Sequence, residues 1–265
     1  MVNIEAQSAN DVLAFREWRF MDRITTALLE EFCKENELTG LKEDRQFEHF
    51  ACFLAVYRHH SETFDTEDVV VADTGIDGIA IIVNGVLVTD VDTVEELAQR
   101  NNYLDVTFVF VQADRSASFD AAKIGSFSFG VADFFKEKPQ LPQNKAMKDA
   151  AEIMTAIYKR SGKFSRGNPS CRLYYVTTGK WVGDTTLETR RQAAITDLKG
   201  TGIFRDVDFI PVDADSIQKL YRQTKNAVHR EFTFADRTTV PEIVGVTEAY
   251  IGLLPAEEFV SILKR

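Results

Sequence analysis

The sequence predicts an α/β protein with a mixed sheet flanked by helices, because short apolar strands alternate with longer amphipathic segments. Two observations carry this prediction. Runs rich in Val, Ile, Phe and Tyr mark strands over 69–73, 78–83, 105–112, 172–178 and 207–212. Around them, apolar residues at helical spacing mark helices over 10–36, 45–60, 148–159, 187–198 and 216–226.

The remaining segments continue the same alternation. Residues 93–100 predict a short helix with Thr93 as its cap and Glu96 three residues on, the spacing of a capping box. Residues 86–88 allow one more short strand, and the segment after Asp114 continues as helix up to a Pro-bearing connector at 137–145. The last part of the chain predicts two short strands and a helix that starts near Pro255.

The composition is that of a chain able to build a buried core, since 45% of its 265 residues are hydrophobic. No apolar run approaches the roughly 18 residues of a membrane span. The N-terminus has neither the basic start nor the apolar stretch of a secretory signal. Three cysteines without CxxC spacing indicate reduced core residues. We therefore expect a cytoplasmic protein that does not bind membranes.

The net charge of -10 is unevenly distributed. Residues 1–150 carry 14 Lys and Arg against 27 Asp and Glu, whereas residues 151–265 carry 17 against 14. An acidic half that holds a metal and a basic half that meets phosphate would fit a nuclease. An ordinary acidic surface explains the same numbers, so the charge alone does not decide.

Polar residues at the ends of two apolar strands predict a metal site. Asp73 and Asp77 flank a Gly-bearing turn before the apolar run 79–83, and Gln112-Ala113-Asp114 closes the strand that begins near 105. Because an unpaired carboxylate in an apolar setting costs several kcal/mol, carboxylates there favour a bound cation. Asp77, Gln112 and the carbonyl of Ala113 would supply oxygens to Mg²⁺ or Mn²⁺, with Glu48 as a further carboxylate.

Each of these residues also has an ordinary structural interpretation. Asp77 can cap a plain turn, Asp73 can be a solvated charge at a strand end, and Glu48 can be a surface residue of its helix. Gln112 can simply bond to neighbouring backbone. The order and spacing of the residues together favour the metal site, and no single residue does.

The segments FEHFACFLAVY (47–57), GIDGIAIIVNG (75–85), VTFVFVQADRSASFD (106–120) and VPEIVGVTEAYIGLLPAEEFVSIL (240–263) resemble abortive infection phage resistance (AIPR) proteins. The resemblance implies a PD-(D/E)XK restriction-endonuclease-like fold, in which a helical Glu, a strand-start Asp and an (E/Q)xK triplet assemble a metal site. The matching positions are Glu48, Asp77 and Gln112-Ala113-Asp114. The resemblance runs from about residue 45 to the end and implies a nuclease-like domain over 41–212, followed by a C-terminal α/β extension over 213–265 that leads toward a further AIPR domain. The helical spacing before it predicts an N-terminal helical segment over 1–40.

The triplet departs from that pattern at its third position, where Asp114 replaces the expected Lys. At about 4 Å and an effective dielectric near 20, each charge unit of the wrong sign is worth about 4 kcal/mol before screening. Lys123 is a better candidate to replace the missing cation than Arg115, which alternates to the opposite side if the strand continues. Asp114 can alternatively serve as an extra metal ligand.

The stretch 158–168 mixes four basic residues with aromatics and glycines, which suits a loop that contacts phosphates. Its candidate nucleic-acid-binding residues are Lys159, Arg160, Lys163 and Arg166. A merely solvated loop is an equally good interpretation.

Three functions remain open from the sequence. The first is a metal-dependent endonuclease that cuts DNA, with double-stranded DNA expected, in defence against phage. The second is a degenerate nuclease fold that binds nucleic acid or a protein without cleaving, which Asp114 favours. The third is a module that assembles with other subunits, including copies of itself, or senses infection.

Overall fold

The computed structural model describes residues 21–60, 62–73, 75–226, 233–239 and 250–263. The chain divides into two compact units, one that ends at Thr224 and one that begins at Lys225. No helix within these described ranges is long and apolar enough to cross a membrane.

The first unit is built around a six-stranded mixed sheet with the order β1-β2-β4-β5-β6, and β3 pairs with β2. The contacts of β2 with β1, β3 and β4 are antiparallel, whereas β4, β5 and β6 run parallel. The strands are β1 (Val70–Asp73), β2 (Ile76–Val83), β3 (Val86–Val88), β4 (Val106–Asp114), β5 (Ser170–Thr177) and β6 (Asp206–Val212).

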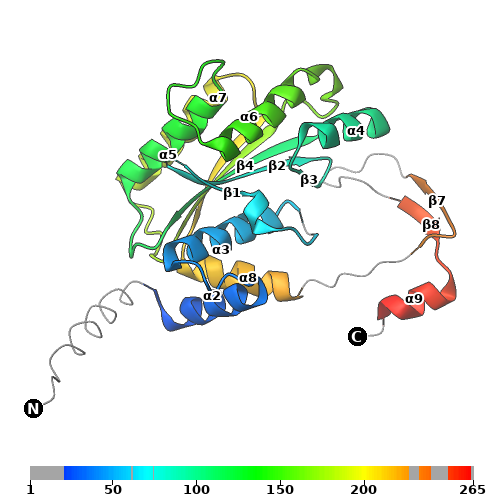
Figure 1. The fold of residues 1–265 in the computed structure, drawn as a ribbon, viewed down its shortest axis with the longest axis horizontal. Helices are drawn as coiled ribbons and strands as arrows, with labels where there is room; N and C mark the ends of the chain where they lie inside the picture. The colour runs from blue at the N-terminus through cyan, green and yellow to red at the C-terminus, as the bar shows by residue number, and fades with distance from the viewer. Residues whose placement is uncertain (1–20, 61, 74, 227–232, 240–249, 264–265) are drawn as a thin grey trace, which may run out of the picture. The chain divides into compact units, whose positions relative to one another are not determined.

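Helices cover both faces of this sheet (Figure 1). One face is covered by α4 (Val91–Asn101), α5 (Ala121–Phe134), α6 (Lys145–Tyr158) and α7 (Thr185–Gly200). The other face is covered by α2 (Arg23–Glu35), α3 (Glu43–Tyr57) and α8 (Ala214–Asn226). The α/β class with a mixed sheet between helices is therefore confirmed.

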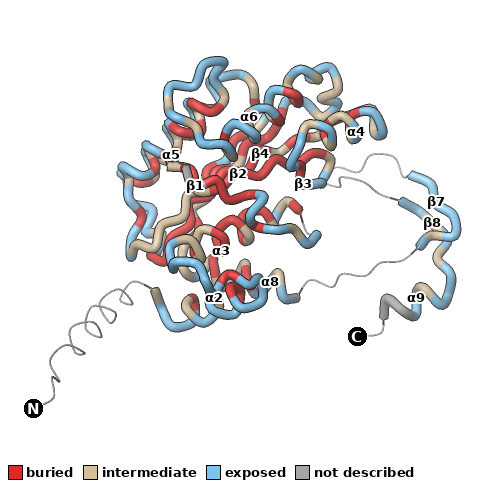
Figure 2. Tube along the Cα trace, viewed as in Figure 1, coloured by how far each residue is buried: buried red, intermediate tan, exposed pale blue. Residues whose placement is uncertain are grey.

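The sheet divides the interior into two apolar clusters, and alternation along β4 supplies both. Phe108 and Phe110 point into the cluster beneath α4–α7, while Val109 and Val111 point into the cluster beneath α2, α3 and α8. The buried residues concentrate along the sheet in Figure 2. Because α2 and α8 share one cluster with α3, the segments expected to lie outside 41–212 pack into the same unit.

Several predicted boundaries shift because side chains cap the helices. The helix expected over 10–36 begins at Arg23, where Asp22 accepts hydrogen bonds from the backbone N–H groups of Ile24 and Thr25; residues 1–20 lie outside the described residues. Asp90, not Thr93, caps α4, and Thr93 donates its backbone N–H to Asp90. The helix expected directly after Asp114 begins only at Ala121.

The second unit contains β7 (Asp236–Thr239) and β8 (Tyr250–Leu253), which pair antiparallel, and α9 (Ala256–Leu263). This agrees with the two short strands and the final helix predicted from the sequence. Residues 240–249, part of the tail segment that carries the family resemblance, lie outside the described residues.

Candidate functional site

Asp77 lies within β2, directly beside the polar end of β4. Its Oδ2 accepts two hydrogen bonds of 2.6 Å each, from Gln112 Nε2 and from the backbone N–H of Ala113. The register Gly78↔Val111 between the antiparallel strands places these residues opposite one another. The interpretation of Asp77 as the cap of a plain turn is wrong, because Asp77 is a strand residue that binds its neighbour strand.

The surroundings of Asp77 disfavour its charge. Burial raises its pKa from the ordinary 3.8 to about 7, and the nearby carboxylates of Glu48 and Asp114 push in the same direction. The Ala113 N–H and the Arg45 guanidinium lower the pKa, but only in part. The carboxyl group therefore lacks enough positive charge around it, as expected of a group that completes its environment with a cation.

Glu48 reaches the same place from α3 and forms an ion pair with Arg45 one turn earlier. Burial raises the pKa of Glu48, and the Arg45 guanidinium opposes that rise. The helix approaches β2 so closely that a Cβ on Gly78 would lie 2.3 Å from the Cys52 Sγ. Glycine at position 78 thus permits the close approach of α3 to the start of β2.

Three groups bind the carboxylate of Asp114, the last residue of β4. Lys123 Nζ lies 2.7 Å from its Oδ2, and the Ser116 and Tyr175 hydroxyls donate hydrogen bonds of 2.9 and 3.1 Å to the same oxygen. Lys123 comes from the first turn of α5, where its side chain is about half exposed. The structure thus brings together Asp114 and the lysine that the sequence suggested in its place.

Arg115 turns away from this cluster. It forms ion pairs of 2.7 Å with Glu43 and 3.0 Å with Asp44, both in the first turn of α3. Its predicted orientation opposite to Asp114 is consistent with these contacts. Asp73 ends β1 across from Ile76, and its side chain is outside the described part of the structure.

The residues present fit a small divalent cation with few protein ligands. Within the described ranges, no three His, Cys, Asp or Glu side chains are grouped so as to hold a metal. Mg²⁺, however, commonly takes only one or two carboxylates and keeps several waters. Asp77 supplies a carboxylate whose charge burial disfavours, and Glu48 supplies a second one, which Arg45 pairs in this structure. Gln112 now presents its amide N–H to Asp77, so it would have to turn its oxygen inward to act as a ligand.

The basic loop 158–168 lies at the opposite end of β4 from the Asp77 cluster. Arg166 pairs with Asp105, which precedes β4, whereas Ala113 at the other end contacts Asp77. Ala113 lies eight positions after Asp105, which in an extended strand is a distance of about 26 Å. The loop and the Asp77 cluster therefore do not form one continuous site.

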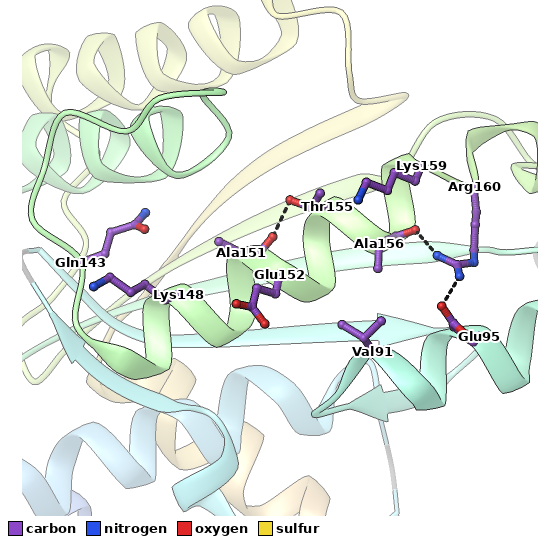
Figure 3. Close-up of a pocket in the computed structure, with 10 residues that line it drawn as sticks. All are labelled: Val91, Glu95, Gln143, Lys148, Ala151, Glu152, Thr155, Ala156, Lys159 and Arg160. Carbon is purple, nitrogen blue, oxygen red and sulfur yellow. Dashed lines mark hydrogen bonds and ion pairs between the residues drawn. The ribbon is translucent and has the colours of Figure 1, made fainter.

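Three of the four basic residues of this loop are bound to the chain itself. Arg160 pairs with Glu95 of α4, Arg166 pairs with Asp105, and Lys163 Nζ donates to the Ala98 carbonyl at 3.0 Å and to Asn102 at 2.9 Å. Lys159 is exposed and, with Arg160, lines a groove of about 590 Å³ between α4 and α6 (Figure 3). The contacts of Arg160, Lys163 and Arg166 favour the structural interpretation of the loop.

A second hollow, of about 640 Å³, lies on the Asp114 side of the sheet, beyond the ends of β5 and β6. Lys180 lines it together with the carboxylates of Asp22, Asp213 and Asp215. Acidic groups outnumber basic ones there, so this hollow does not add a phosphate-binding surface to the Asp77 cluster.

Sequence reasoning missed two members of the cluster, Arg45 and Tyr175. Arg45 precedes Glu48 by three residues, a helical spacing at which opposite charges meet, so its role was readable. Tyr175 reaches Asp114 only because β4 and β5 pair in parallel with Asp114 opposite Thr177. That register is a tertiary property that no local pattern reveals.

Two histidines also differ from expectation. His59 and His60 follow α3 closely, a sequence position that is typical of surface residues at a helix end. His60 is instead buried and bonds to the Gly85 carbonyl, and His59 lies 2.8 Å from the Tyr174 hydroxyl. Burial lowers the pKa of His59 to about 4, so it is neutral at physiological pH and belongs to the packing.

Comparison with known protein families, characterised proteins and solved structures finds no match to this chain.

Proposed function

We propose that this protein is a metal-dependent endonuclease that acts on double-stranded DNA in the cytoplasm, in defence against phage. The proposal takes its reaction class from the resemblance to AIPR proteins and its site from the Asp77 cluster. The observation that carries it is the lysine ammonium of Lys123, 2.7 Å from Asp114. A cation thus stands beside the position at which the motif has its lysine.

Each residue of the cluster has a distinct role in this proposal. Asp77 and Glu48 bind Mg²⁺ or Mn²⁺, and the Ala113 N–H fixes the orientation of the Asp77 carboxylate. When bound, the ion would activate water and neutralise charge on the scissile phosphate. Lys123 places positive charge where negative charge develops on the phosphate, and Asp114 positions Lys123.

The restriction-endonuclease-like fold is part of the same proposal. A mixed sheet with α3 on one face and α5 on the other carries a strand Asp on β2 beside a Gln-x-x position on β4, and α3 carries a Glu. This arrangement supports the assignment through the spatial order of the residues.

A catalytically silent relative that binds DNA or a protein is the second candidate. The observation that favours it is Asp114 itself, a carboxylate within the cluster that raises the pKa of Asp77 further. Such a protein would bind its partner without turnover, and its affinity would not depend on a divalent cation.

The test is cleavage of supercoiled and linear DNA by the purified chain in Mg²⁺ and in Mn²⁺, with Asp77→Ala as the control. The proposal expects metal-dependent cleavage that is lost in the variant. Cleavage that survives in Asp77→Ala contradicts the assigned site. DNA binding without cleavage under either metal supports the silent alternative.

A further inference from the structure

Arg45 is bound to the carboxylate that the metal would use. Its guanidinium forms an ion pair with Glu48 one turn away on α3, in a pair whose side chains are 37% and 17% exposed. The guanidinium lies near enough to Asp77 to lower the pKa of that carboxyl group as well. One cation is thus shared electrostatically between the two proposed metal-binding carboxylates.

A divalent cation at Glu48 and Asp77 would meet this guanidinium. Two cations a few ångströms apart repel each other strongly in a site that is partly shielded from water. The Arg45 side chain is the more exposed member of its pair, so it can move into solvent without unpacking the core. Glu48, whose side chain is 17% exposed, is the more shielded member of the pair.

We infer that Arg45 occupies the cation position at Glu48 in the metal-free protein, and that a divalent ion must displace it to bind. Metal loading is then an exchange of one cation for another, and Arg45 regulates how much metal the site takes up. This inference rests on the proposed function, because it assumes that Glu48 and Asp77 bind metal.

Gln112 likewise donates hydrogen bonds to oxygen atoms of the proposed metal site in the metal-free protein. The amide N–H of Gln112 donates to the Asp77 oxygen and, at 3.3 Å, to the Ala113 carbonyl. Both oxygens are thereby occupied by a donor in the metal-free arrangement. Arg45 and Gln112 thus supply donors to the Glu48 and Asp77 carboxylates in the metal-free protein.

Mn²⁺ binding to the whole chain tests the exchange directly. Electron paramagnetic resonance counts free Mn²⁺ and gives the dissociation constant without any need for activity. Arg45→Gln should bind Mn²⁺ on the order of ten-fold more tightly than the unmodified protein, because the competing cation is gone. Arg45→Lys, which keeps a cation, should bind as weakly as the unmodified protein.

Arg58→Gln is the matched control. Arg58 follows the same helix at its other end, thirteen residues and about 20 Å from Arg45, and its loss changes the net charge equally. Its Mn²⁺ affinity should stay unchanged. If Arg58→Gln tightens binding as much as Arg45→Gln, the effect is one of net charge and the exchange is refuted.

A double-mutant cycle tests whether Arg45 acts on metal binding through Glu48. In the Glu48→Gln background the Arg45→Gln change should have a much smaller effect on Mn²⁺ affinity, since only the weaker electrostatic effect of Arg45 on Asp77 remains. A second measurement follows the unmodified protein itself: Mg²⁺ titration should shift the Arg45 guanidinium NMR signal, and Arg45→Lys serves only to assign that signal. An Arg45 signal that stays unchanged at saturating Mg²⁺ overturns the inference.

The outcomes separate the two proposals. Measurable Mn²⁺ binding that is equal in the unmodified protein and in Arg45→Gln refutes the exchange and leaves the proposed nuclease intact. Absence of Mn²⁺ binding in both proteins refutes the metal site itself, and the exchange with it.

Discussion

Two aspartates near opposite ends of β4 differ in how their charges are compensated. Asp105 directly precedes the strand, and Asp77 of β2 lies beside its other end. At the start of the strand, Asp105 is bound by two arginines, Arg205 at 2.7 Å and Arg166 at 3.3 Å. Near its other end, Asp77 of β2 receives only N–H donors from Gln112 and Ala113. Burial raises its pKa to about 7, and the carboxylates of Glu48 and Asp114 push in the same direction.

The difference teaches which aspartate is structural and which is a candidate for function. Asp105 has its charge fully compensated, so it joins loops and strands at that edge and has no cation left to bind. Asp77 is held in place by hydrogen bonds yet lacks a charge partner of its own, and burying such a group weakens the fold.

The largest predicted difference between Asp77 and Asp105 is in the rate of DNA cleavage. Asp77→Ala should lower the rate of DNA cleavage by at least about a thousand-fold, because the metal loses a carboxylate ligand. Asp105→Ala should leave the rate per folded molecule within about three-fold, because Asp105 lies about 26 Å away. Initial rates on linear DNA in Mg²⁺, normalised to the folded fraction, check this. Equal losses in both variants would contradict it.

Lys123 should have the next largest effect. Lys123→Met should lower the rate by about 100-fold, comparable to the loss of one charge-stabilising group in other enzymes, while Mn²⁺ affinity stays unchanged or rises. Asp114→Lys introduced into that variant should recover at least part of the rate, since it restores a cation at the motif position. Single-turnover kinetics give the comparison. Full activity in Lys123→Met would remove it from the site.

The stability of the fold should respond with opposite signs at the two ends. The folded pKa of Asp77, about 7, lies above its ordinary 3.8, so the folded state binds the proton more tightly and loses stability as pH rises from about 4 to 7. Without metal, Asp77→Asn should therefore raise the free energy of unfolding at pH 8, on the order of 1–3 kcal/mol, and by much less at pH 4.

Asp105→Asn should instead lower that free energy on the order of 1–3 kcal/mol, because Arg166 and Arg205 lose their carboxylate. Urea unfolding in EDTA at both pH values measures the two variants side by side. If Asp77→Asn destabilises the protein at pH 8 as much as Asp105→Asn does, the contrast between the two ends fails.

The smallest effect belongs to the basic loop. Arg160→Gln should change DNA affinity by less than about two-fold, since Arg160 is already paired with Glu95, and its main effect should be a loss of stability of up to about 1 kcal/mol. Fluorescence anisotropy with labelled duplex DNA at two salt concentrations checks this. A drop in affinity of ten-fold or more would restore the loop as a DNA-binding surface.

Sequence reasoning reached the fold class because strand and helix periods are local properties of the chain. It reached the neighbourhood of Asp77 and Gln112 because both residues interrupt strongly apolar strands. It failed at helix starts such as Arg23 and Ala121, where a single capping aspartate decides the boundary.

The basic loop 158–168 shows why contacts between distant parts of the chain could not be predicted from the sequence. Arg160, Lys163 and Arg166 looked available for phosphate because their partners on α4 and before β4 lie more than 50 residues away in sequence. Pairing across such separations depends on the sheet register and on how helices pack, and no local composition encodes it. The Lys123–Asp114 pair was accessible because nine residues separate its members and one short connection joins them.

The most direct measurement is calorimetric titration of Mn²⁺ into the unmodified chain, Asp77→Asn and Asp105→Asn. We predict saturable binding to the unmodified chain and to Asp105→Asn, and its loss in Asp77→Asn. Binding that is the same in Asp77→Asn as in the unmodified chain, or that is absent from all three proteins, would contradict a metal site at the Asp77 end of β4.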